Sequence, residues 1–155
     1  MIALANGLYL FCLVLWVGST LFFTLVVAPT LFSSLPVEAA GAAVSLVFPL
    51  YYVVAAICGL VLLVSLAWRA QRLARAAAWR EVGLVGVLWL CSLYAGLVVQ
   101  PRAAALKAER NAGGEGAVRA AAEFQRVHRV AMGLNTVVLI GGLVLVVATS
   151  RRLRD

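Results

Sequence analysis

The chain has 155 residues, of which 65% are hydrophobic and 12% are charged, whereas about 25% of the residues in an ordinary soluble domain are charged. This length accommodates one bundle and excludes a second domain of usual size. The net charge of +7 comes from cations outside the apolar runs, so it indicates anionic lipid headgroups as partners and argues against nucleic acid.

Four stretches of the chain contain no charged residue, and each is close to the roughly 20 apolar residues that cross a bilayer. A charged side chain costs about 2.5 to 3.5 kcal/mol at the membrane centre, so such runs indicate helices surrounded by lipid. We therefore predict an all-α integral membrane protein, a four-transmembrane-helix bundle that forms a single domain over residues 1–155. The predicted spans are Ile2 to Ala28, Val44 to Ala67, Val82 to Val99 and Val130 to Thr149.

The first run is longer than the apolar core of a secretory signal and has no Lys or Arg before it, so we predict a retained helix. Proline cannot donate to the preceding helical turn, and the helix is expected to end at Ala28 and Pro29. The connector Thr30 to Ala43 suits a short interfacial helix that begins at Pro36. A kink is expected near Pro49 in the second span.

Orientation follows from the Lys and Arg residues that flank the spans. The second connection, Trp68 to Arg80, and the C-terminal tail together carry seven, whereas the third connection carries six and the first none. We therefore predict a multi-pass protein of the cytoplasmic (inner) membrane with both termini inside. The seven are Arg69, Arg72, Arg75, Arg80, Arg151, Arg152 and Arg154, and the six are Arg102, Lys107, Arg110, Arg119, Arg126 and Arg129.

The third connection, residues 101–129, is too long for a bare loop in a compact bundle. It is rich in alanine, and its helix-breaking residues cluster between Asn111 and Gly116. We therefore predict that the third and fourth helices extend into a helical hairpin outside the membrane, with arms Pro101 to Ala112 and Ala117 to Arg129. Glu123 is expected to pair with Arg119 or Arg126 on a solvated face of the second arm.

His128 and Asn135 are the polar members of an apolar seam along the fourth helix. They are seven residues apart, so they share one helical face about 10 Å apart and are expected to face inward. In the predicted topology, polar residues of the other three helices occupy the same outer half of the bundle. These are Ser19, Thr20, Thr24, Tyr51, Tyr52, Tyr94 and Gln100.

Two interpretations of this polar layer stay open. In the first, hydroxyls and amides hydrogen-bond between helices and hold the bundle together. In the second, they line a small pocket that opens outside and receives a solute or cation, with His128 titrating near neutral pH. The candidate ligand-binding residues are His128, Asn135, Tyr51, Tyr94, Thr24 and Arg126.

No cofactor and no enzymatic activity are expected. Carboxylates are absent from the four runs, and neither a nucleophile elbow nor a zinc-protease motif is found. Haem held by two histidines needs two copies of the chain, because His128 is the one histidine. A copper(I) site would form only if Cys12, Cys58 and Cys91 faced one another. Glu81 is expected to pair with Arg80.

Small residues at helical spacing predict close helix packing. They are Ala55 and Gly59, Ser92 and Gly96, and Gly133, Gly141 and Gly142.

A set of short motifs runs from Trp16 to Asn135, and the chain resembles the transmembrane protein 205-like family, also called domain of unknown function 4149. The motifs are Trp16-Val-Gly18, Ala28-Pro29-Thr30-Leu31-Phe32, Phe48-Pro49-Leu50-Tyr51-Tyr52 and Phe124-Gln125-Arg126-Val127-His128-Arg129. The resemblance implies a four-helix membrane protein of uncharacterised mechanism, and no reaction. Its hallmark positions here are Trp16, Gly18, Pro29, Phe32 and Pro49, together with Tyr51, His128 and Asn135.

These observations lead to one functional hypothesis and one alternative. The hypothesis is a small-solute or cation binding or transport module centred on the polar layer. The alternative is a non-catalytic accessory subunit or assembly factor, in which the layer only locks the helices and the apolar faces dock a larger membrane complex or a second copy.

Overall fold

The computed structural model describes residues 2–73 and 76–152, with side chains from 6–71 and 79–152. Those residues form no strand, and four of their helical segments are long and apolar enough to cross a membrane. The prediction of an all-α membrane bundle is confirmed. The segments are Asn6–Ser34, Val37–Gln71, Trp79–Ala112 and Ala117–Arg152.

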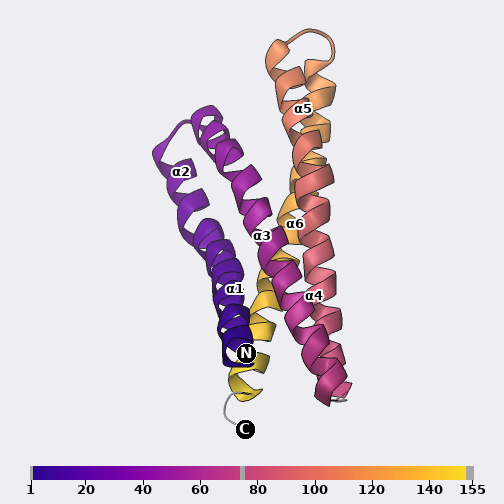
Figure 1. Cartoon of the computed structure of the whole chain (residues 1–155). Coiled ribbons are helices and arrows are strands. Elements are labelled where there is room, and N and C mark those ends of the chain that lie inside the picture. Colours follow the sequence, from indigo (N-terminus) through magenta and orange to yellow (C-terminus); the bar gives the residue numbers. More distant parts are fainter. Residues whose placement is uncertain (1, 74–75, 153–155) are drawn as a thin grey trace.

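The helices pack as a four-sided bundle whose two termini lie at one end (Figure 1). We call this the terminal end, and the opposite end the hairpin end. Around the bundle, α1 (Ile2–Phe22) packs on α3 (Val37–Leu73), α3 on α4 (Ala76–Tyr94), α4 on α6 (Ala117–Arg152), and α6 on α1. Toward the hairpin end the bundle divides, because α2 (Ala28–Ser34) with the start of α3 separates from α5 (Gln100–Ala112) with the start of α6 (Figure 1).

The prediction that the first helix ends at Pro29 is wrong, because the helix continues to Ser34. The five residues of η1 (Phe23–Val27) form a π-helical turn, and the Ala28 N–H bonds the carbonyl of Phe23. The wider turn displaces the hydrogen-bond ladder by one residue. Pro29 then stands at the start of the resumed α-helix, where its missing N–H costs little.

The third rod is built in the same way. A second π-helical turn, η2 (Ala95–Val99), joins α4 to α5, and the Gln100 N–H bonds the carbonyl of Ala95. Pro101 follows at the start of α5. Both prolines therefore lie inside continuous helical rods.

The second rod, α3, is one helix of 37 residues with Pro49 inside it. It includes both the interfacial helix expected from Pro36 and the predicted span Val44 to Ala67, which the sequence pattern had separated.

The predicted arms of the hairpin are present as α5 and the first part of α6. The turn between them places Gly113 and Gly114 at φ of 75° and 85°, a region that favours glycine. The arms pack on each other, and each has a buried residue, Leu106 on α5 and Ala120 on α6. They reach well past the tip of α2 and α3 (Figure 1).

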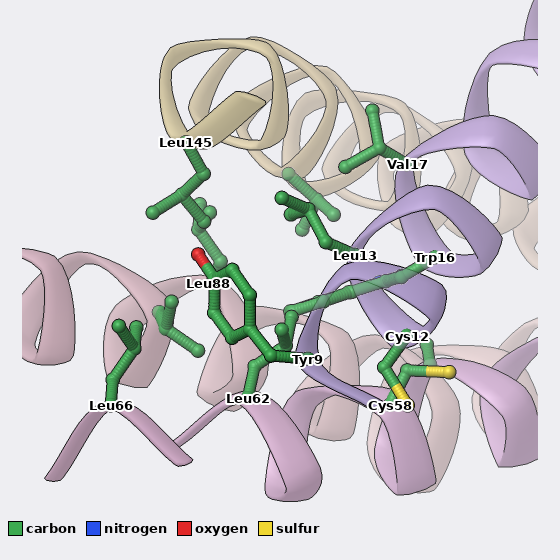
Figure 2. Packing of buried hydrophobic residues seen from close by; sticks show 13 residues of the cluster. Tyr9, Cys12, Leu13, Trp16, Val17, Cys58, Leu62, Leu66, Leu88 and Leu145 are labelled. Atoms are coloured by element: carbon green, nitrogen blue, oxygen red, sulfur yellow. The ribbon is translucent and has the colours of Figure 1, made fainter. Parts of the chain in front are cut away.

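The core lies in the half of the bundle nearer the terminal end. Figure 2 shows Tyr9, Leu62, Leu66, Leu88 and Leu145 converging from four helices. Each is at most 2% exposed, so this part of the bundle interior is sealed by close packing.

The two halves of the chain repeat each other. The π-helical turn η2 starts 72 residues after η1, and Pro101 follows Pro29 by the same interval. Just before each turn, a hydroxyl bonds the carbonyl four residues back: Thr20 to Trp16 at 2.9 Å, and Ser92 to Leu88 at 3.1 Å.

Contacts between the halves repeat with the partners exchanged. A Cβ on Gly59 would meet Trp89 of the second half at 2.2 Å, and a Cβ on Gly142 would meet Val17 of the first half at 2.9 Å. Val17 and Trp89 are again 72 residues apart, while Gly59 and Gly142 are 83 apart. Such reciprocal contacts define an approximate two-fold axis along the bundle. Residues of α3 and α6 are related by 83 positions and not by 72, because the connection from α4 to α6 is longer than the connection from α1 to α3.

Close packing at small residues is confirmed for Gly59, Gly96, Gly141 and Gly142, where an added Cβ would come within 3 Å of a side chain of another helix. Gly133 has open space around it and packs on nothing within 4 Å.

Candidate polar site between the two halves

The polar layer is a chain of hydrogen bonds that joins three helices. Tyr51 of α3 donates its hydroxyl to Oδ1 of Asn135 in α6 at 2.9 Å. Nδ2 of Asn135 donates to Oγ1 of Thr24 in η1, also at 2.9 Å. The hydroxyl of Thr20 lies 3.0 Å from that of Tyr51. These bonds link three helices, the continuous rod of α1 and η1 with α3 and α6, at the depth of the first π-helical turn.

Proton counting shows how Thr20 takes part. Each hydroxyl carries one proton, and that of Tyr51 is committed to Asn135. Thr20 therefore donates either to the oxygen of Tyr51 or to the carbonyl of Trp16, which lies 2.9 Å away. The layer thus contains one proton that can move between two acceptors.

Aromatic rings pack around Tyr51 of the layer. Phe23 lies 5.2 Å from Phe48 and 5.7 Å from Tyr51 between ring centroids, and Tyr52 lies 5.1 Å from Tyr51. Tyr52 also packs closely on Gly96 of η2. The rings hold the phenol of Tyr51 in place between the two halves.

A cavity with a water-accessible volume of about 10 Å³ lies beside the layer, close to the smallest volume that holds one water molecule. Its lining includes Tyr51, Ser92 and Asn135. The two-fold relation explains its position. The residue of α6 that lies 83 positions after Tyr51 is Leu134, so Ser92 meets no phenol where its counterpart Thr20 does.

The structure brings together three of the six candidate ligand-binding residues. Tyr51, Thr24 and Asn135 form the layer, whereas Tyr94, Arg126 and His128 are exposed and lie outside it. The prediction that His128 faces inward is wrong. At its level α6 is paired with α5 while α2 has separated (Figure 1), and the imidazole stacks on Phe124 with ring centroids 5.9 Å apart.

The hairpin carries an exposed ion pair between Arg102 of α5 and Glu123 of α6. The expected partners of Glu123 were Arg119 and Arg126 on its own helix, so the observed pair is a correction. Its hydrogen bond with Arg102 is the main cause that lowers the pKa of Glu123. The pair ties the two arms together. On α5, Lys107 reaches toward α3, with Nζ 3.5 Å from the hydroxyl of Ser45.

A second group of polar residues, which sequence reasoning missed, lies at the terminal end. The hydroxyls of Tyr9 and Thr149 are 2.8 Å apart, and Nη1 of Arg152 lies 2.6 Å from Oε2 of Glu81. Glu81 therefore pairs with Arg152 and not with Arg80, which is exposed. The signal available in the sequence was the position of these residues at the limits of the apolar runs.

Two of the three cysteines meet. The sulfur atoms of Cys12 and Cys58 lie side by side in the core (Figure 2), whereas Cys91 lines the cavity beside the polar layer. Among the described residues, no three metal-binding side chains gather at one point. The condition for a three-cysteine copper site is not met.

The expected hallmark residues have different environments. Trp16 is 2% exposed, and its Nε1 is buried without a hydrogen-bond partner among the described residues. Pro29 begins α2, and Pro49 lies inside α3. Gly18 and Phe32 are exposed, so they do not contribute to the core.

A family model described as domain of unknown function (DUF4149) matches residues 11–112. The chain belongs to this family. The matched part includes both π-helical turns but ends at α5, so Asn135 and His128 lie outside it. No curated protein and no solved structure matches the chain.

Proposed function

We propose that this DUF4149 protein is a small-solute or cation binding and transport module, with its site at the polar layer between the two halves. The observation that carries the proposal is the pair of equivalent π-helical turns, each followed by proline, that flank a layer of uncharged oxygen ligands. Transporters with repeated halves commonly bind substrate between the repeats, where helices are irregular.

The chemistry of the layer limits the ligand. It offers hydroxyl and amide oxygens from Thr20, Thr24, Tyr51 and Asn135 and no carboxylate. Such groups suit a small neutral polar solute or a monovalent cation. The cavity of about 10 Å³ is close to the volume that holds one water molecule. A bare monovalent cation is of similar size, whereas a neutral solute such as glycerol is larger, so binding of a neutral solute requires α2 and α5 to move apart at the two turns.

The test is flux through the purified protein in liposomes, with glycerol and urea as neutral probes and thallium(I) as the cationic probe. We expect the protein to pass at least one probe faster than empty liposomes do. Asn135→Leu should abolish that flux, because it removes both hydrogen bonds of the amide. Thr136→Val is the matched control, since this exposed neighbour bonds only within its own helix.

Two results would overturn the proposal: no flux of any of the three probes, or a flux that Asn135→Leu leaves unchanged. The alternative is an accessory subunit or assembly factor that docks a larger membrane complex or a second copy. It is favoured by the mutual hydrogen bonding of the layer. Under it, Asn135→Leu lowers thermal stability only, and the native protein purifies with a reproducible partner.

We further propose that the protein lies in the cytoplasmic membrane with both termini inside and the α5–α6 hairpin outside. The support is the distribution of Lys and Arg along the sequence.

A further inference from the structure

Two arginines from equivalent positions of the two halves lie at the terminal end. Arg69 of α3 and Arg152 of α6 are 83 residues apart, the interval that relates Gly59 to Gly142. Nη1 of Arg69 donates to Oδ1 of Asn6 in α1 at 3.0 Å, and Nη1 of Arg152 donates to Glu81 in α4. Each second helix is thus bonded to the first helix of its own half.

The arginines belong to one electrostatic cluster. Arg69 bonds Asn6 of α1, and the guanidinium of Arg152 lies 5.3 Å from the ring centroid of Tyr9, which is one turn further along the same helix. Arg69 is thus within electrostatic reach of Arg152 and Glu81. Among the described side chains of this cluster, Glu81 is the one carboxylate. Asn6, the partner of Arg69, is neutral, so the cluster carries one positive charge in excess.

Hydrogen-bond donors are also in excess. A guanidinium presents five N–H donors in a planar fork. Nε of Arg152 is buried without a partner among the described residues, and the side chain as a whole is 25% exposed. Within the part of the chain that the structure describes, Arg69 forms one hydrogen bond, to Asn6. A ligand at this site would therefore be an anion that accepts several hydrogen bonds.

The cluster lies where a headgroup would be. Arg69 follows the last residue of the second apolar run, Ala67, by two positions, and Arg152 follows Thr149 by three. Trp68 and Trp79, at the same end, are 39% and 51% exposed, as tryptophans at a membrane boundary commonly are.

We propose that Arg69 and Arg152 form a binding site for a phosphate-type oxyanion at the terminal end of the bundle. Guanidinium groups bind such anions through paired, charge-assisted hydrogen bonds. The phosphate of an anionic lipid and free inorganic phosphate share this chemistry. The site is independent of the polar layer, because Asn135 lies 17 residues from Arg152 along α6, which corresponds to about 26 Å.

The experiment has two arms that separate the sources. In one, inorganic phosphate is titrated into the purified protein in a neutral detergent at constant ionic strength, and the melting temperature is followed. In the other, native mass spectrometry counts phosphatidylglycerol and phosphatidylcholine molecules retained from mixed micelles. We expect selective retention of phosphatidylglycerol for a lipid source, and saturable stabilisation by inorganic phosphate for a soluble one.

Matched variants decide whether the site is specific. Arg69→Gln and Arg152→Gln should each weaken binding at least about tenfold, which corresponds to about 1.4 kcal/mol, close to the lower limit expected for losing a hydrogen bond to a charged group. Arg151→Gln and Arg80→Gln change exposed arginines at the same end and should leave binding within about twofold, as expected for exposed surface charges.

Glu81→Gln provides a test that does not depend on removing an arginine. The carboxylate competes with the ligand for Arg152, so its neutralisation should tighten binding. The proposal is overturned if neither phosphatidylglycerol nor phosphate binds, if Arg151→Gln weakens binding as much as Arg152→Gln, or if Glu81→Gln weakens it.

Discussion

Tyr51 is the residue through which the polar layer connects the two halves, because its hydroxyl contacts both Thr20 of α1 and Asn135 of α6. In a membrane the apolar side chains gain little from leaving lipid, so hydrogen bonds between helices contribute a larger share of the specificity of packing. A phenol at this position therefore fixes how three helices approach.

Replacing Tyr51 by phenylalanine should lower thermal stability, since it removes the hydroxyl and retains the ring. Each interhelical hydrogen bond in a membrane contributes about 0.6 to 2 kcal/mol, and Tyr51 makes two such contacts. The measurement is the unfolding transition of the purified protein in detergent. Tyr94→Phe is the control, because Tyr94 is 51% exposed. Equal stability of the two variants would contradict the role given to Tyr51.

Sequence reasoning identified part of this site. Tyr51, Thr24 and Asn135 could be selected because polar residues are rare in apolar runs and recur at related depths. His128 could not be placed correctly. Its spacing from Asn135 gives the same helical face, but whether that face is covered depends on α2, which diverges from α6 beyond the layer (Figure 1).

At the scale of the elements, Pro29 and Pro101 are each accommodated by a π-helical turn that precedes them. The sequence placed Pro29 correctly at a break in the regular α-helix, but local rules for proline favour ending the helix there. In a membrane a π-helical turn within a continuous helix is preferable to a helix end, whose last carbonyl groups would lack hydrogen-bond partners. For Pro101, the same local rule for proline predicted a helix boundary at the place where the α5 arm begins.

The hairpin should lose local stability in acid. The pKa of Glu123 is lowered from its usual 4.5 by the hydrogen bond with Arg102, so the folded hairpin favours the charged carboxylate. This contribution is fully present above about pH 5 and is lost as the pH falls through the lowered pKa, below 4.5.

Amide hydrogen exchange of residues 101–129, corrected for the intrinsic pH dependence, would measure this change. Glu123→Gln should remove the acid-sensitive part of the protection and leave that of α1 unaltered. An unchanged pH profile in this variant would show that the pair with Arg102 does not stabilise the hairpin.

At the scale of the whole molecule, the four spans could be predicted because long runs without charged residues indicate helices that are surrounded by lipid. The repeat was missed. Leu-Val-Val-x-Pro recurs at an interval of 72 (residues 25–29 and 97–101), and Gly-Leu-Val-Leu-x-Val recurs at 83 (residues 59–64 and 142–147). Two different intervals hide the relation from a search at one fixed period, and Leu and Val are common in any membrane-spanning run. It becomes visible through contacts, such as Gly59 with Trp89 and Gly142 with Val17.

Orientation is testable with one cysteine. Glu115→Cys, made in a variant in which Cys12, Cys58 and Cys91 are replaced by serine, places a thiol in the exposed hairpin turn. Glu115 is preferable to Gly114, whose φ of 85° disfavours a side chain. With both termini inside, a membrane-impermeant maleimide should label this cysteine from outside intact cells. Labelling only after the cells are broken would reverse the orientation.

The parallel arrangement of the halves also bears on how the protein enters the membrane. With both termini inside, as proposed, both connections at the hairpin end would cross the bilayer in the same direction, yet the one between α2 and α3 contains no Lys or Arg whereas the later one contains six. The early hairpin can be translocated at little electrostatic cost. Once the α2–α3 connection has crossed the membrane, the more highly charged α5–α6 hairpin has to cross in the same direction during synthesis.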